Sequence, residues 1–276
     1  MREVVKMSQE NQESRQPVLF LPHGGGPCFF MEWGNTWDRM AAYLRSVSGT
    51  LPRRPDAIVV MSGHWETDEM RVGSAPHPPL IYDYYGFPPH TYQLEYPVPG
   101  APDVAAKALG LLRDAGVVCA TDPGRGLDHG VFIPFMLAFP DASIPVVEIS
   151  LPRTMDAADV LQLGQSLEPL RDKNILLVGT GMTYHNMRYL MRPDAVSDAR
   201  SVAFDNWLQS TVEAPSDPRR SRLMDWEHAP FARDCHPQPE HLLPLMFAAG
   251  AAGTDAGHRD YSDVIMGKAL SGFRFG

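Results

Sequence analysis

The side chains of this 276-residue chain that could do chemistry are histidines, of which there are ten. Three of them, His23, His64 and His185, follow short apolar runs with the composition of buried strands. A fourth, His129, stands just before an apolar stretch at 131–139. In open α/β sheets, functional groups gather at the carboxyl ends of the strands. We therefore expect these four imidazoles to meet at one edge of one sheet.

Imidazoles gathered in this way predict a metal site. Neutral imidazole binds Fe(II) and Zn(II) well, and several rings are needed to hold either ion against water. Any one of these histidines could instead be an ordinary polar residue in a loop. The pair His23 and His64 favours a metal centre, because each closes a buried strand. We expect Gly24–Gly26 and Gly63, beside this pair, to leave room for a substrate at the ion.

A further ligand is expected from the segment Cys-His-Pro-Gln-Pro-Glu-His-Leu-Leu-Pro-Leu at 235–245. Three of its residues could bind a metal: His236, Glu240 and His241. A site of two histidines and one carboxylate would use Glu240, and the spacing alone does not choose among the three.

Several apolar runs rich in Val and Ile predict the strands that carry these residues. They are continuous rather than alternating, as a sheet covered on both faces requires. The expected strands are 18–21, 57–61, 117–120, 144–149 and 175–178.

Helical patterns lie between the runs. Pro102 suits a first helical turn, Gly116 suits the stop after a last turn, and Thr36 is expected to cap its helix. The expected helices are 36–47, 102–115, 131–139, 156–170, 202–212 and 240–249. Alternation of strand and helix predicts an α/β fold: a single domain with a largely parallel central sheet covered by helices on both faces.

The stretch 76–102 differs, because it is rich in proline and tyrosine. It cannot be a regular central strand or helix. We expect an ordered excursion that packs its rings over another part of the protein. A surface loop held by its own rings and a lid or dimer contact both remain open.

The composition indicates which kinds of binding partner and which cell compartment to expect. A net charge of -9, with no block of basic residues, argues against nucleic acid as a partner, and no stretch reaches the length of a membrane span. Cys28, Cys119 and Cys235 are too few and too widely spaced for a disulfide framework, which favours the cytoplasm. Residues 1–15 lack the apolar run of a signal peptide and are expected to be a disordered tail, leaving 16–276 as the catalytic domain.

Six motifs in order resemble the class III extradiol ring-cleaving dioxygenases, in the branch that contains 4,5-DOPA dioxygenase. The resemblance covers nearly the whole chain from Val18 onward. The motifs are Pro-His-Gly-Gly-Gly-Pro at 22–27, Ser-Gly-His-Trp at 62–65, Tyr-Asp-Tyr-Tyr-Gly-Phe-Pro at 82–88, Leu-Asp-His-Gly at 127–130, Tyr-His-Asn at 184–186 and Pro-Gln-Pro-Glu-His at 237–241.

This resemblance implies a nonheme Fe(II) site, which zinc can occupy in purified members, and a catechol substrate cleaved with O2. His23, His64 and His241 are the implied ligands, with His241 where related enzymes carry a glutamate. His185 is the implied acid/base beside the metal and can become a fourth ligand. His129 is implied to contact substrate or oxygen. The triplet Gly24–Gly26 departs from a serine-containing version, a difference that bears on substrate preference more than on metal binding.

By resemblance, the leading substrate is L-DOPA, whose seco-DOPA product cyclises to betalamic acid or muscaflavin. A zinc-dependent hydrolase using metal-bound hydroxide is the alternative, although the chain has no H-E-x-x-H motif. A noncatalytic binding protein is a third interpretation, disfavoured because His129 and His185 are both present. The oligomeric state is left open.

Roles are also expected for several other polar residues. Asp128 is expected either to orient His129 or to cap a helix. Tyr184 could line the pocket or lie in the core, and His236 could support His241. Four further histidines are expected at the surface: His77, His90, His228 and His258.

Overall fold

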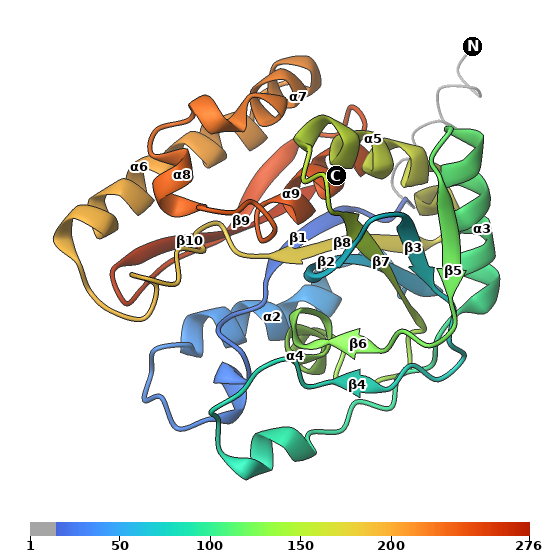
Figure 1. The fold of residues 1–276 in the computed structure, drawn as a ribbon, viewed down its shortest axis with the longest axis horizontal. Coiled ribbons are helices and arrows are strands. Elements are labelled where there is room, and N and C mark those ends of the chain that lie inside the picture. Colours follow the sequence, from blue (N-terminus) through green and yellow to red (C-terminus); the bar gives the residue numbers. More distant parts are fainter. Residues whose placement is uncertain (1–14) are drawn as a thin grey trace.

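The computed structural model describes residues 15–276, and its centre is one mixed sheet. The strands are β1 (Val18–Pro22), β2 (Ala57–Thr67), β3 (Met70–Gly73), β5 (Cys119–Asp122), β7 (Val146–Pro152), β8 (Ile175–Gly181), β9 (Gly257–Ile265) and β10 (Lys268–Phe275). Their order is β5-β3-β7-β2-β8-β1-β10-β9 (Figure 1). The four central strands, β7, β2, β8 and β1, run parallel. The predicted largely parallel sheet is therefore confirmed.

Helices cover both faces of this sheet, as predicted. They are α2 (Asp38–Thr50), α3 (Pro102–Asp114), α4 (His129–Ala138), α5 (Ala157–Leu167), α6 (Ala195–Val212), α7 (Ser216–Met224), α8 (Ala232–Cys235) and α9 (Leu243–Ala251). Figure 1 shows α2 and α4 on one side, and α5, α6 and α9 on the other. Short 3-10 turns occur at Cys28–Phe30, Pro89–Gln93, Glu168–Lys173 and Trp226–His228.

The apolar strands form the core because both of their faces are covered. Every residue of β1 and β8 is buried. Helix α9 is buried throughout and lies between α5 and the sheet. Burial of such strands and helices is the main favourable term in folding.

Several predicted boundaries were wrong. The helix expected at 36–47 begins at Asp38, and Trp37 at its start makes no side-chain cap, so Thr36 does not cap it. The helix expected at 240–249 begins only at Leu243, which leaves Glu240 and His241 in the preceding turn. Strand β2 continues to Thr67, so His64 lies within it, at an irregularity in its pairing with β7.

The excursion at 76–102 is ordered, as expected, and lies against α4. Its strand β4 (Leu80–Ile81) pairs in parallel with β6 (Leu127–Asp128), just before α4. The hydroxyls of Tyr82 and Tyr84 donate to backbone carbonyls within the excursion. The ring of Tyr84 lies 5.7 Å from that of His129, so this segment walls one side of the histidine cluster.

The predicted tail, 1–15, falls outside the described residues except for Arg15. The guanidinium of Arg15 contacts Glu168 at 3.1 Å and Asp172 at 2.8 Å. Among residues 15–276, no helix combines the length and the apolar character needed to cross a membrane.

Candidate metal centre

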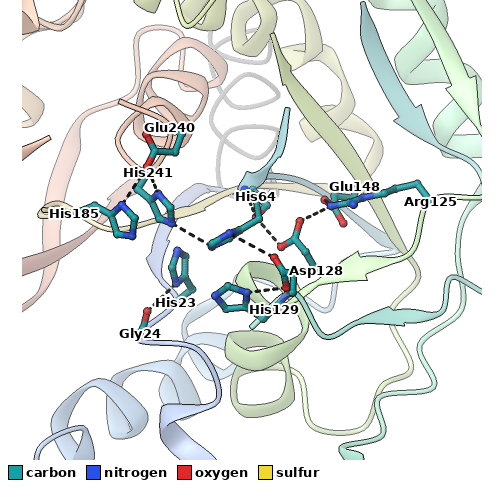
Figure 2. Close-up of polar contacts among 12 residues, drawn as sticks. His23, Gly24, His64, Arg125, Asp128, His129, Glu148, His185, Glu240 and His241 are labelled. Carbon is teal, nitrogen blue, oxygen red and sulfur yellow. Dashed lines mark hydrogen bonds and ion pairs between the residues drawn. The ribbon is translucent and has the colours of Figure 1, made fainter. Parts of the chain in front are cut away.

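Five histidines from distant parts of the chain lie together at the carboxyl ends of the central strands (Figure 2). One follows β1, one lies in β2, one begins α4, one follows β8 and one precedes α9. They are His23, His64, His129, His185 and His241. The topology of the sheet explains the gathering, because β2, β8 and β1 are neighbours that run in the same direction.

Three of these rings form the tightest group. His23, His64 and His241 each offer one ring nitrogen, and these nitrogens lie within 4.8 Å of one another. The Nε2 atoms of His64 and His241 are 3.2 Å apart. The Nε2 atom of His23 is buried and has no hydrogen-bond partner in the described part of the chain.

The outer nitrogen of each of these rings faces an oxygen atom. His23 donates from Nδ1 to the carbonyl of Gly24 at 2.9 Å, and His241 Nδ1 lies 2.9 Å from Glu240 Oε1. His64 Nδ1 faces Asp83 Oδ2 at 3.5 Å. In a neutral imidazole one nitrogen carries hydrogen and the other a lone pair, so these oxygens direct the Nε2 lone pairs inward.

This arrangement fits a cation. Two bare Nε2 lone pairs 3.2 Å apart repel each other unless a positive charge lies between them. A metal bound at about 2.0–2.1 Å from each nitrogen would remove that repulsion. The donor set therefore suits an imidazole-binding ion such as Fe(II) or Zn(II).

The pKa values of the same rings favour the neutral form that a metal needs. Burial, together with the nearby His129, lowers the pKa of His64 to about 4. Burial also holds the pKa values of His23 and His241 well below the ordinary value. All three rings are neutral near pH 7 and require no proton release to bind a cation.

Glu240 lies outside the three-nitrogen group. Its Oε1 accepts from Nδ1 of His241 at 2.9 Å and faces Nδ1 of His185 at 3.1 Å. Burial opposes ionisation of Glu240, but the hydrogen bond from His185 gives its carboxyl a net lowered pKa. Of the candidates in segment 235–245, His241 therefore faces the centre. Glu240 contacts the outer nitrogens of His241 and His185 and so orients both rings.

Asp83 likewise contacts two rings, those of His129 and His64. This role was not predicted from the sequence. Its Oδ1 accepts from the backbone N–H of His129 at 2.9 Å and from the ring Nδ1 at 2.8 Å. Burial opposes its ionisation, but His129 and His64 lower its pKa to about 2. The motif at 82–88 contains Asp83, yet 46 residues separate it from His129, so spacing gave no indication of the contact.

Asp128 does neither of the things expected of it. It makes no side-chain cap for α4, and the hydrogen-bond acceptor of the His129 ring is Asp83. Instead it accepts from Ser62 Oγ at 2.8 Å and from Arg125 at 2.7 Å. Because Ser62 in turn accepts from the backbone N–H of His64, Asp128 supports the backbone of β2 beside that ring.

A buried charge cluster lies behind this contact. Arg125 binds Glu148 at 3.0 Å as well as Asp128, and both carboxyl side chains are 1% exposed. Burial raises the pKa of Glu148 well above its ordinary value, and Asp128 adds to the effect. Arg125 is therefore the cation that keeps two buried acidic groups together.

Two of the glycines expected to leave room for a substrate, Gly24 and Gly63, also serve close packing. A Cβ at Gly63 would lie 2.8 Å from the Glu240 carbonyl oxygen, and one at Gly24 would lie 2.5 Å from Cys28 Sγ. A Cβ at Gly181 would lie 2.1 Å from the His241 carbonyl oxygen. Gly63 and Gly181 let the turn before α9 press against the strand ends.

The remaining candidates lie outside the centre. The Tyr184 hydroxyl contacts Ser197 Oγ, so this residue is a core tyrosine. His236 is fully buried between Phe204 and Trp226, with no hydrogen-bond partner for its ring among the described residues, and it does not support His241. The four histidines expected at the surface are exposed: His77, His90, His228 and His258.

Known proteins resemble this chain over most of its length. Residues 19–271 match the family described as the catalytic LigB subunit of aromatic ring-opening dioxygenase. The chain is 35% identical to dioxygenase tasH of Hapsidospora irregularis over 280 residues, covering 94% of this chain and 85% of that protein. It is 37% identical to 4,5-DOPA dioxygenase extradiol of Beta vulgaris over 205 residues, covering 74% of this chain and 76% of the relative.

Two comparisons with Escherichia coli K12 extend the likeness. The 4,5-DOPA dioxygenase extradiol of Escherichia coli K12 is 32% identical over 242 residues, covering 86% of each chain. The crystal structure of an uncharacterized E. coli K12 protein, JW3007, superposes with a TM-score of 0.74 at 29% identity, covering 95% of this chain and 100% of that one. This chain therefore belongs to the LigB family of extradiol aromatic ring-opening dioxygenases.

Proposed function

We propose that this protein is a nonheme Fe(II)-dependent extradiol dioxygenase that cleaves the ring of a catechol such as L-DOPA with O2. The observation that carries the proposal is the convergence of one nitrogen each from His23, His64 and His241 within 4.8 Å. These three histidines are the proposed ligands, with His185 as a fourth ligand or an acid/base. Three ligands on one face of an octahedral ion leave positions for both reactants.

When bound, Fe(II) would bring the catechol and O2 together and let electrons pass between them. The nearby histidines supply the proton transfers, because imidazole titrates close to neutrality. His185 accepts a catechol proton at Nε2, because Glu240 occupies its Nδ1. His129 accepts and returns a proton during ring opening, and the Asp83 carboxylate stabilises its protonated ring.

The product expected from L-DOPA is a seco-DOPA that contains both atoms of O2 and cyclises to betalamic acid or muscaflavin. The cytoplasm is the proposed compartment, because its reducing conditions suit three free cysteines, Cys28, Cys119 and Cys235.

The test is to load the metal-free protein anaerobically with Fe(II) and then add L-DOPA and O2. We expect oxygen uptake matched by a yellow ring-opened product, whose mass and NMR spectrum distinguish betalamic acid from muscaflavin. A zinc-loaded sample is the matched control and should consume no oxygen. The same three-histidine donor set suits zinc, so ester hydrolysis by that sample, without oxygen uptake by the iron-loaded one, would favour the zinc hydrolase instead.

A further inference from the structure

The carboxylates of Glu240 and Asp83, which lie beside the centre, are arranged in the same way. Each joins a proposed metal ligand to a histidine proposed to transfer protons. Glu240 contacts His241 and His185 through one oxygen, Oε1. Asp83 uses both oxygens: Oδ1 for His129 and Oδ2 toward His64. The two oxygens of Asp83 therefore act on different rings, and a substitution can separate their effects.

We propose that Asp83 is a positioning residue that fixes the tautomers of His64 and His129, so that Nε2 of each ring faces the reaction centre as a lone pair. This inference rests on the proposed function for the roles of the two rings. The tautomers are inferred from contacts of this chain alone: Nδ1 of His129 is 2.8 Å from Asp83 Oδ1, Nδ1 of His64 is 3.5 Å from Oδ2, and a carboxylate only accepts hydrogen bonds.

The contact with His129 fixes the orientation of the carboxylate. Oδ1 accepts from the backbone N–H of His129 at 2.9 Å and from its ring at 2.8 Å. The backbone N–H is at the first residue of α4, where the helix leaves its N–H groups without partners and favours negative charge. An acceptor is therefore required at the Oδ1 position.

This constraint makes Asp83→Asn informative. The amide must keep its oxygen toward His129, since its NH2 group would otherwise face the backbone and ring N–H donors. The NH2 group then points toward His64 Nδ1, which Oδ2 faces at 3.5 Å in the native protein. A donor at this place favours hydrogen on His64 Nε2, the nitrogen that a metal needs.

Asp83→Asn should therefore impair His64 and spare His129, whereas Asp83→Ala should affect both rings. For D83N we expect metal affinity to fall about 10- to 100-fold, the usual effect of losing an oxygen partner behind a metal-binding histidine. For D83A we expect a similar fall, and we also expect His129 to lose its preference for the Nδ1–H tautomer.

The affinity of Zn(II) for each variant can be measured by chelator competition. The tautomer of each ring can be read from 15N chemical shifts of histidine-labelled, metal-free protein. Asp68→Asn is the matched control, because Asp68 is 84% exposed and its partner Arg153 is 61% exposed. This control should bind zinc as the wild type does.

Zinc affinity of D83N within twofold of wild type would overturn the proposal, as would an unchanged His129 tautomer in D83A. The wild-type spectrum is a test by itself, because an Nε2–H signal from His129 would refute the proposal even if neither variant folds. Neither readout uses catechol cleavage. A wild type that binds zinc with the expected tautomers but never cleaves a catechol would refute the proposed function and leave this inference standing.

Discussion

The rings of His185 and His241 are stacked, with centroids 3.3 Å apart and planes inclined by 18°. Both rings present Nδ1 to the same oxygen of Glu240. The stack places the ring of His185, which is outside the three-nitrogen group, directly beside the ring of His241, which belongs to it. His185 is thus held close to the centre by packing against His241 and by its hydrogen bond to Glu240.

This relationship predicts the phenotype of His185→Gln. We expect the turnover number to fall by about 100-fold or more, because proton transfer by a positioned histidine contributes that much. Iron content after reconstitution should stay near the wild-type value, because His23, His64 and His241 are untouched. Steady-state kinetics and metal analysis on the same samples check this, and an equal loss of activity and metal would make His185 an obligate ligand.

Replacing a proposed ligand should have the opposite result. His23→Ala or His64→Ala should remove bound iron, since two imidazoles hold an ion poorly against water. Metal content measured after reconstitution and gel filtration is the readout, with His228→Ala as the exposed control. Full occupancy in either variant would refute the ligand assignment.

We expect the metal-free protein to lose stability in acid because of His236. Burial lowers the pKa of His236 to about 3, whereas an unfolded chain restores it to about 6.5. As pH falls below about 6.5, the unfolded state takes up the proton first, and stability is lost down to the folded pKa near 3. This loss amounts to about 2 kcal/mol at pH 5.

The variant His236→Phe should therefore lose about 2 kcal/mol less than wild type between pH 7 and pH 5. Urea unfolding of metal-free protein at both values measures the difference. The other buried histidines contribute equally to both proteins and cancel in the comparison. Parallel pH profiles would show that His236 takes up its proton in the folded state as readily as in the unfolded one.

The cluster around Arg125 predicts a stability effect. Arg125→Ala leaves Asp128 and Glu148 buried without their cation, which should cost about 3–5 kcal/mol of unfolding free energy. Adding Glu148→Gln should recover part of the loss by removing one acidic group. The surface control Arg71→Ala, whose pair with Glu69 is solvated, should change stability by less than about 1 kcal/mol. A loss below 1 kcal/mol for Arg125→Ala would contradict this account.

Sequence patterns predicted the parts of the fold where burial alone decides structure. The continuous runs at 57–61 and 175–178 became β2 and β8, because a strand covered on both faces must be apolar throughout. The hairpin of β9 and β10 was missed. Strand β9 lies at the sheet edge, where exposed residues alternate with buried or half-buried ones, and its polar sequence did not stand out from loops.

The positions of the site histidines could be predicted, because neighbouring parallel strands bring their carboxyl ends to one edge of the sheet. The histidine positions followed from the runs that precede them. Their carboxylate partners did not, because Asp83 reaches His129 only through the folding of an irregular, proline-rich segment. The choice between Glu240 and His241 likewise depended on where α9 begins, which is decided by tertiary packing at Gly63 and Gly181.

Strand β1 lies between β8 and β10, so the strand that ends just before His23 is completed by the last strand of the chain. Because His23 directly follows β1, loosening the pairing of β10 with β1 should disturb the position of that imidazole and with it the three-nitrogen group.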